Sequence, residues 1–586
     1  MNRAVKHLLH ELWPTDDLLA GILHGCGGSK RLFDRVEFWD EVHERGGIVS
    51  ETEQQRGRRR ILVADPVAKA GIERLRPAGD VDVATGLSEA ELIERIPDYD
   101  AMVVRSETKV TEPIFAAARR LKVVARAGVG VDNIDVAAAT RYGVVVVNSP
   151  EGNTIAAAEH SIAMLLAMSR KIPDAAASLR RGEWKRSQFV GIEVYNKVLG
   201  VIGFGKIGRE VARRGRGLGM RVLAFDAFVT PEVARREGVE LVELKELYRE
   251  SDYISVHTPL TRDTRGLIND ETLALMKDGV RLINCARGGI IDESALLRGL
   301  ESGKVAGAAL DVFEKEPPAP DSPAVALINH PKVVPTPHLG ASTEEAQVNV
   351  AVDVADQIVA ILDGRPPRSA VNMPAISADV FARLEPALEL GVRIGKLQAQ
   401  LADSPITAVS VTYSGELLNE QVQPVTRGVL MGLLQPVLAQ SVNFVNAPYI
   451  AEQRGIRVTE SKTAGEEEYS NYIAVEVEEQ NGRRRIGGTV IGRRDYRIRE
   501  IDQFQIDLKP EGYLVFARHT DRPGVIGSVG TLLGEAKINI GGMYVGREER
   551  GKRAIMVLTV DEPVSDELLQ KIETAIHADL VRLVEL

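Results

Sequence analysis

The 586-residue chain contains only two cysteines, Cys26 and Cys285. Two thiols cannot cross-link a protein of this length, and the sequence has no Cys-x-x-Cys pair of the kind that binds zinc. Metal sites need three or four converging ligands, so His24 beside Cys26 does not indicate one. We therefore expect a protein of the reducing cytoplasm with no metal site.

Long apolar runs are also missing, and so is an excess of positive charge. No apolar run approaches the ~20 residues that span a bilayer, and the short run LLAGILHG lacks the cationic lead of a signal peptide. The formal net charge of -10 gives no general attraction to nucleic acid or to an anionic membrane. Hydrophobic residues make up 44% and charged residues 27% of the chain, which is typical of a soluble globular protein.

The chain is too long for one hydrophobic core, so several domains are expected. Residues 1–60 show no regular pattern, and we assign them no function. From residue 61 onward, short β-branched runs alternate with helical stretches, and a second such series lies between residues 198 and 312. Apolar strands that alternate with helices predict an α/β fold with two doubly wound, parallel-sheet, Rossmann-like domains. The first series gives strands at 61–65, 101–104, 122–126 and 144–147, and helices at 88–96 and 112–121.

The C-terminal part has a different pattern. Residues 375–510 combine an apolar helix at 425–440 with strands at 406–415 and 472–480, which predicts an α+β domain. Residues 513–586 follow the order βαββαβ, which is that of a compact ferredoxin-like unit.

A glycine-rich turn, VIGFGKIGRE at residues 201–210, has the spacing of a dinucleotide-binding site. It follows an expected strand and opens an expected helix, which is the context that the motif requires. Gly203 permits the tight turn, Gly205 lets backbone N–H groups approach a pyrophosphate, and Gly208 lets the helix pack on the sheet. Asp226 ends the next expected strand, where an acid binds ribose hydroxyls and repels a 2′-phosphate, so NAD is expected rather than NADP.

Hydride transfer between a nicotinamide and a 2-hydroxy acid needs a cation for the carboxylate, a base for the hydroxyl proton and a partner for that base. Arg287 follows an expected strand in NCARGG, and its planar guanidinium matches a carboxylate. His338 in TPHLGAST can accept and return a proton near neutral pH, and Glu316 in DVFEKEP is the candidate partner. Arginines after strands are often surface ion pairs, and the chain has ten histidines, so spacing alone does not select this set.

Five motifs together closely resemble the D-isomer-specific 2-hydroxyacid dehydrogenases: RAGVGVDNID, NSPEGNTIAAAEH, NCARGGIIDESAL, ALDVFEKEPP and TPHLGASTEEAQ. The resemblance covers residues 61–586 and points to the long members of this family, which oxidise 3-phosphoglycerate with NAD at the first step of L-serine biosynthesis. It implies that Arg287, Glu316 and His338 are the catalytic residues, in the roles given above.

The resemblance also implies a domain order that explains why the glycine-rich turn comes late in the chain. In this family the NAD-binding domain is inserted into a discontinuous substrate-binding domain, and the cleft between them closes over the reactants. The implied parts are an N-terminal extension (1–60), a substrate-binding domain (61–157 and 342–372), an NAD-binding domain (158–341), an intervening domain (373–512) and an ACT domain (513–586).

Further ligand contacts are implied residue by residue. For the cofactor they are Gly203, Gly205, Lys206, Ile207, Gly208, Asp226, Thr258, Asp311 and Val129. For the substrate they are Arg105, Arg126, Asn153 and the backbone N–H groups of Val129 and Gly130. Some relatives carry a basic residue where Glu107 stands, which leaves the full set of phosphate contacts open.

ACT domains bind small molecules, often amino acids, between two copies. The family pattern maps contacts to L-serine onto His519, Asp521 and Asn539, although His519 stands where some relatives have an aromatic residue. A dimerisation domain without a ligand is the alternative. The basic runs at 483–485 and 492–497 could bind an anionic effector, but we favour solvated charge at strand edges.

Two other functions remain open. A glyoxylate or hydroxypyruvate reductase of the same family is one, and the appended ACT domain argues against it. An NAD-sensing interaction protein without catalysis is the other, and the complete set of Arg287, Glu316 and His338 argues against it. We expect a homodimer or homotetramer, since sensor domains of this type usually pair, and no nucleic-acid or membrane partner.

Overall fold

The computed structural model describes residues 59–374, 376–464, 469–480, 482–492 and 494–586. His24, Cys26 and the expectations for the N-terminal extension lie outside these ranges. Within them, no helix combines the length and the apolar character needed to cross a membrane. The same ranges contain no cluster of three or more histidine, cysteine or acidic side chains that could hold a metal ion.

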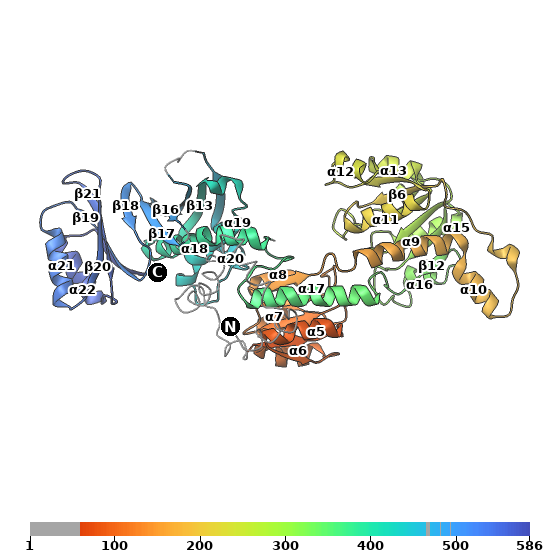
Figure 1. Ribbon diagram of the computed structural model, residues 1–586, viewed down its shortest axis with the longest axis horizontal. Helices are drawn as coiled ribbons and strands as arrows, with labels where there is room; N and C mark the ends of the chain where they lie inside the picture. Colours follow the sequence, from red (N-terminus) through yellow and green to blue (C-terminus); the bar gives the residue numbers. More distant parts are fainter. Residues whose placement is uncertain (1–58, 375, 465–468, 481, 493) are drawn as a thin grey trace, which may run out of the picture. The chain divides into compact units, whose positions relative to one another are not determined.

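The first sheet has five parallel strands in the order β2-β1-β3-β4-β5. Its strands are β1 (Arg60–Val63), β2 (Asp80–Val83), β3 (Ala101–Val104), β4 (Val123–Arg126) and β5 (Val145–Asn148). The connecting helices are α5 (Lys69–Leu75), α6 (Glu89–Arg95), α7 (Glu112–Ala117) and α8 (Val136–Arg141) (Figure 1). The central strands are buried on both faces, because helices cover both sides of a parallel sheet.

A segment far along the chain completes this first sheet. Helix α17 (Glu344–Leu362) packs against α5, and its buried residues Val350, Val354 and Ile358 join the apolar cluster formed by β1, β3 and β4. Beyond α17, residues 369–372 lie along the free edge of β5, with an antiparallel bridge between Ala370 and Val147. One hydrophobic core is therefore built from two stretches that are distant in sequence.

The second sheet has seven parallel strands in the order β12-β11-β10-β9-β6-β7-β8. They are β6 (Val198–Ile202), β7 (Arg221–Phe225), β8 (Glu240–Leu241), β9 (Tyr253–Val256), β10 (Val280–Asn284), β11 (Val305–Leu310) and β12 (Val333–Pro335). The strand order reverses between β6 and β9, and ligands of such sheets bind at the carboxyl ends of the strands at this point. Helices α9 (Thr154–Arg170) and α11 (Lys206–Gly217) pack against each other beside the sheet (Figure 1).

Apart from the first of them, which precedes β6, the remaining helices of this part connect the strands of the second sheet. They are α10 (Ile172–Arg180), α12 (Pro231–Arg236), α13 (Leu244–Glu250), α14 (Asp270–Leu275), α15 (Glu293–Ser302) and α16 (Pro323–Ile328). Side-chain caps mark the first turn of two of these helices. Asp292 accepts a hydrogen bond from Ala295 N at the start of α15, and Asn269 accepts one from Thr272 N at the start of α14.

The third sheet is mixed, in the order β14-β13-β15-β16-β17-β18, and helices α18, α19 and α20 accompany it. Its elements are α18 (Ala378–Leu401), β13 (Ile406–Gly415), α19 (Gln423–Leu434), α20 (Ala447–Gln453), β14 (Arg457–Lys462), β15 (Asn471–Glu479), β16 (Gly482–Ile491), β17 (Asp495–Ile501) and β18 (Phe504–Leu508). Helices α18 and α19 pack closely because Gly395 and Gly432 lie directly against backbone atoms of the other helix.

The last sheet is antiparallel, in the order β20-β21-β19-β22. Its elements are β19 (Tyr513–Thr520), α21 (Val525–Glu535), β20 (Ile540–Arg547), β21 (Arg553–Val560), α22 (Asp566–Ile576) and β22 (Leu580–Glu585). This is the expected βαββαβ order, and the predicted fold class is confirmed for all four sheets.

Some sequence-based expectations for single elements are wrong. The helix expected at 112–121 ends at Ala117, where Ala118 turns extended, and the helix expected at 425–440 ends at Leu434, just before Pro436. The basic run 483–485 does not lie at a sheet edge, because β16 is an interior strand between β15 and β17. Its arginines are paired across neighbouring strands, as in the contacts Arg484–Glu479 at 3.0 Å and Arg485–Glu500 at 2.5 Å.

Candidate active site

The glycine-rich turn connects β6 to α11 at the point where the strand order reverses. Gly203 has φ 91°, and a Cβ on it would lie 2.5 Å from His257 O. A Cβ on Gly208 would lie 2.0 Å from Gly203 O, so only glycine lets α11 approach the turn this closely. A Cβ on Gly205 would meet no atom within 4 Å. The first and third glycines are thus required by packing within the protein, while the second borders open space at the amino end of a helix, where a pyrophosphate fits.

This difference predicts opposite phenotypes for two alanine substitutions. G205A should leave the free energy of unfolding within ~0.5 kcal/mol and raise the KM for NAD by ~10-fold or more through lost hydrogen bonds to a charged pyrophosphate. G208A should destabilise the fold by ~1–3 kcal/mol through overpacking. Urea unfolding and NAD titration of both variants test this, and a G205A protein that is destabilised but binds NAD normally would contradict it.

The other predicted cofactor residues surround this turn. Asp226 follows β7, and its two carboxylate oxygens accept hydrogen bonds from Phe204 N and Phe228 N, each at 2.8 Å. Lys206 pairs with Glu151, and Ile207 packs onto the apolar cluster beneath α11. Thr258 follows β9, and within the described residues its buried Oγ1 has no hydrogen-bond partner. These groups fit a dinucleotide, since the turn is open at Gly205 and Thr258 offers a free hydroxyl.

A neutral histidine directly follows β9, the strand next to the turn. Burial lowers the pKa of His257 to about 4, and its Nε2 lies 2.8 Å from Ser255 Oγ. His257 therefore adds no positive charge to the site at neutral pH, and the helix terminus and Lys206 are left to favour phosphate.

His338 and Glu316 form a direct pair. His338 Nδ1 lies 2.6 Å from Glu316 Oε2, and the other carboxylate oxygen accepts a hydrogen bond from Phe313 N at 3.0 Å. Burial raises the pKa of Glu316, but the hydrogen bonds from His338 and Phe313 N outweigh it, so the pKa lies below its usual range. An ionised Glu316 fixes the Nδ1–H tautomer of His338 and leaves Nε2 as the proton acceptor.

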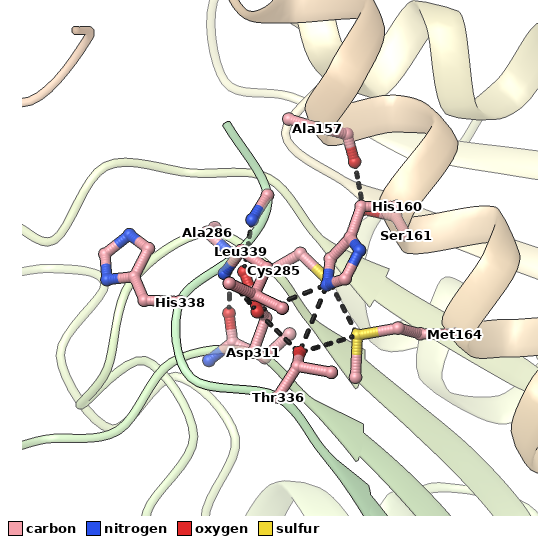
Figure 2. A network of polar contacts seen from close by, with 12 residues as sticks. Ala157, His160, Ser161, Met164, Cys285, Ala286, Asp311, Thr336, His338 and Leu339 are labelled. Carbon is pink, nitrogen blue, oxygen red and sulfur yellow. Dashed lines mark hydrogen bonds and ion pairs between the residues drawn. The ribbon is translucent and has the colours of Figure 1, made fainter. Parts of the chain in front are cut away.

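The loop that carries His338 is held by a buried network around Asp311 (Figure 2). The Asp311 carboxylate accepts hydrogen bonds from Leu339 N at 2.7 Å, Gly340 N at 2.8 Å and Thr336 Oγ1 at 2.5 Å. His160 of α9 lies 3.2 Å from the same carboxylate. Burial raises the pKa of Asp311, but these hydrogen bonds, from His160 first, lower it overall. Figure 2 shows the His338 ring pointing away from this network.

Asp311 is predicted to contact the cofactor, but in the structure its side chain holds the loop of His338. The residue is fully buried, and its carboxylate is occupied by the loop that positions His338. The backbone supports the same arrangement, because His338 has φ 56° and its N–H donates to Asp311 O at 2.8 Å. His160 and Thr336 were not predicted. His160 lies within α9 with a side chain that is 20% exposed, and a histidine inside a helix gives no signal in the sequence without the fold.

Three arginines gather at the carboxyl ends of β3, β4 and β10. A Cβ on Gly130 would lie 1.9 Å from Arg287 Nη2, so the guanidinium occupies the space over this glycine. Arg126 lies over Gly128 in the same way, at 2.0 Å. Burial lowers the pKa of Arg126 to about 10, and the charges of Arg287 and Arg105 add to the effect. The guanidinium group of Arg126 is therefore close enough to those of Arg287 and Arg105 to be repelled by both.

The counter-charge in this arginine cluster is small. Arg287 Nε donates to Asp132 Oδ2 at 3.1 Å, and Arg105 N donates to Asp65 Oδ2 at 2.5 Å. Among the described residues, the buried Nε of Arg126 has no hydrogen-bond partner. Asn153 Oδ1, before α9, is likewise buried without one. Uncompensated cations with free hydrogen-bonding groups form a site for an anion, or for two anionic groups of one molecule.

Comparisons with known proteins agree with this geometry. Residues 162–340 match the family model "D-isomer specific 2-hydroxyacid dehydrogenase, NAD binding domain", residues 383–502 match "D-3-phosphoglycerate dehydrogenase intervening domain", and residues 513–577 match "ACT domain". The D-3-phosphoglycerate dehydrogenase of Synechocystis is 49% identical over 88% of this chain and 92% of its own length. Those of Archaeoglobus fulgidus and Bacillus subtilis are 46% and 44% identical, over 89% and 90% of this chain and 100% and 99% of their own lengths.

The chain belongs to the D-3-phosphoglycerate dehydrogenase family. The family predicted from the motifs is confirmed, and so are the enzyme class, an NAD-dependent dehydrogenase, and the cofactor NAD.

The ACT domain of this D-3-phosphoglycerate dehydrogenase family member contains the three residues predicted to contact serine. Asp521 is approached by Arg547 Nη1 at 3.5 Å and Gly551 N at 3.2 Å, and Asn539 donates to Asp561 Oδ2 at 2.7 Å. His519 is buried on β19, and among the described residues its Nε2 has no hydrogen-bond partner. An amino acid at this site would compete with the existing partners of Asp521 and Asn539.

Proposed function

We propose that this protein oxidises 3-phospho-D-glycerate to 3-phosphohydroxypyruvate with NAD. The observation that carries the proposal is the arginine cluster. A 2-hydroxy acid such as lactate needs one cation for its carboxylate, whereas a substrate with a carboxylate and a phosphate needs more. Arg105, Arg126 and Arg287 supply three, and Arg126 has a free Nε for an anionic oxygen.

The proposed reaction assigns one role to each of these side chains. Arg287 binds the carboxylate through its planar fork, together with the N–H groups of Val129 and Gly130. His338 Nε2 takes the proton of the 2-hydroxyl group, and Glu316 stabilises the imidazolium that forms. The glycine-rich turn, Asp226 and Thr258 would hold NAD, which would supply the hydride acceptor for C2. Arg105 and Arg126 hold the phosphate, and Asn153 offers an additional contact.

The proposal includes the domain division and the regulation expected from the sequence. Residues 61–157 with 342–372 bind the substrate, residues 158–341 bind NAD, and residues 373–512 and 513–586 regulate. L-serine bound at His519, Asp521 and Asn539 is the proposed effector, and a homodimer or homotetramer is the proposed assembly. The buried, unpartnered Nε2 of His519 supports a ligand at this position.

The test of substrate is NADH formation with 3-phosphoglycerate, compared with D-glycerate as the phosphate-free analogue. R105A should raise the KM for 3-phosphoglycerate by ~10-fold or more, because hydrogen bonds to charged groups contribute ~1.5–3 kcal/mol each, and should leave the KM for D-glycerate within about threefold. Equal losses for both substrates would contradict the phosphate assignment.

Two further measurements test the rest of the proposal. Turnover of glyoxylate or hydroxypyruvate but not of 3-phosphohydroxypyruvate would favour the reductase instead. Inhibition by L-serine would support the effector site.

A further inference from the structure

The loop after β4 contains the sequence Gly128-Val129-Gly130, which needs an external restraint. Two glycines around one residue allow many backbone conformations, and the peptide between Val129 and Gly130 can flip at low cost because Gly130 has no Cβ. In a planar trans peptide the C=O and the following N–H point in opposite directions. Any group that holds Val129 O therefore also sets the direction of Gly130 N–H.

Asn148, the last residue of β5, holds this oxygen. Its Nδ2 donates to Val129 O at 2.5 Å, and Ser149 N donates to Gly128 O at 2.9 Å. The peptide is thereby fixed from the β5 side. Among the described residues, Gly130 N–H has no hydrogen-bond partner in the protein, and it lies in the loop covered by the Arg287 guanidinium. This free N–H is one of the two proposed donors to the substrate carboxylate.

Asn148 is itself restrained by two residues that come much later in the chain, Gln357 and Ser369. Ser369 Oγ donates to Asn148 Oδ1 at 2.7 Å, which leaves the amide nitrogen facing Val129 O. Gln357 of α17, which is 1% exposed, donates through Nε2 to Asn148 O and accepts from Ser369 N, both at 2.9 Å. The side-chain amide is therefore bonded at both ends and cannot rotate without breaking a bond.

We propose that Asn148 is a positioning residue for the substrate carboxylate. It fixes the Val129–Gly130 peptide so that Gly130 N–H is presented to the substrate, and Ser369 keeps the Asn148 amide in the required orientation. The inference rests on the proposed function, because it takes this loop as the carboxylate site. Asn148 itself touches no reacting atom and acts only through the peptide.

Asn372 provides a matched control. It also bonds through its side-chain amide to backbone groups of the β5 edge, accepting from Val146 N at 2.9 Å and donating to Val144 O at 2.8 Å. It has no contact with Val129. N148A and N372A therefore each remove one side-chain amide that bonds at the β5 edge, and only N148A frees the loop. S369A is a milder change that leaves Asn148 in place.

The experiment measures KM for 3-phosphoglycerate, KM for NAD and the thermal midpoint for the three variants of the full chain. N148A should raise KM for 3-phosphoglycerate by ~10-fold or more, and S369A by ~2- to 10-fold, as expected for one hydrogen bond to a charged group and one neutral bond. KM for NAD should stay within about twofold. N372A should lower the thermal midpoint and leave both KM values unchanged.

A second ligand separates positioning from general loosening of the site. Glycerol 3-phosphate carries the phosphate without the carboxylate, so N148A should leave its inhibition constant within about twofold. If N148A weakens glycerol 3-phosphate and 3-phosphoglycerate equally, or if N372A raises KM as much as N148A, the inference is overturned. A wild type that oxidises another 2-hydroxy acid but not 3-phosphoglycerate overturns the proposed function alone, and the KM ratio of N148A to N372A for that acid then decides the inference.

Discussion

Replacing His338 by asparagine is expected to lower kcat for 3-phosphoglycerate oxidation by about 10²- to 10⁴-fold, the usual contribution of a general base. Asparagine is the suitable replacement because it tolerates the positive φ of this position, 56°. The KM values for 3-phosphoglycerate and NAD should change little, because the His338 ring contacts the reacting hydroxyl group and not the carboxylate or the phosphate by which the substrate is bound. E316Q, which removes the charge paired with Nδ1 at 2.6 Å, should lower kcat by less.

Steady-state kinetics with a parallel binding measurement for NAD test this prediction. H330N is the control, because His330 follows α16 and its ring Nδ1 accepts a hydrogen bond from the backbone N–H of Lys332, at 3.1 Å, away from the site. H330N should keep the wild-type kcat. An H338N enzyme that retains more than a tenth of wild-type activity, with NAD binding intact, would mean that another group takes the hydroxyl proton.

Replacing Arg287 by glutamine should reduce kcat/KM for 3-phosphoglycerate by about 10²-fold or more, because two hydrogen bonds to a charged carboxylate, each ~1.5–3 kcal/mol, are lost together. The loss should be equally large with D-glycerate, since both substrates carry the carboxylate. This distinguishes Arg287 from Arg105, whose replacement should affect only the phosphorylated substrate. Affinity for NAD, measured by titration without substrate, should be unchanged.

R298Q serves as the matched control for Arg287. Arg298 lies on α15, the helix that follows the Arg287 loop, and pairs with Asp270 at 2.5 Å on an exposed surface. Exposed pairs contribute ~0–1 kcal/mol, so R298Q should behave like the wild type. If R287Q loses kcat/KM only with 3-phosphoglycerate, Arg287 binds the phosphate and the assignment of the cluster must be exchanged.

What the sequence predicted well depends on short distances along the chain. The steric demands at Gly205 and Gly208 lie within a single turn and helix, so the motif alone predicts which of the two contacts the backbone and which borders open space. The contact of Gly203 with His257 O comes from a distant loop and needed the fold. Apolar strands were found because their runs are continuous. Strand β2 has the sequence DVDV at the sheet edge and was missed, since half of its residues are acidic.

What the sequence could not predict depends on contacts between distant residues. Asn148 and Ser369 are far apart in the chain, and nothing in the sequence around either residue indicates that the two meet. The same holds for His160 beside Asp311, and for the burial that leaves Arg126 Nε without a partner. The basic run at 483–485 was placed at a sheet edge because the strand order of the third sheet cannot be derived from composition. The motifs identify the charged residues of the site, whereas the residues that surround them are known only from the fold.

The return of α17 to the first sheet has a consequence for the order in which the chain can fold during synthesis. Strands β1 to β5 emerge from the ribosome first, but the apolar face covered by Val350, Val354 and Ile358 stays bare until these residues have been made. The free edge of β5 likewise waits for residues 369–372. The residues of the second sheet lie between these two stretches, and at ~5–20 residues per second their translation takes on the order of 10 to 40 seconds. During that time the second domain can close as a unit while the first remains a sheet with one exposed hydrophobic face, which makes the nascent chain a natural client for chaperones.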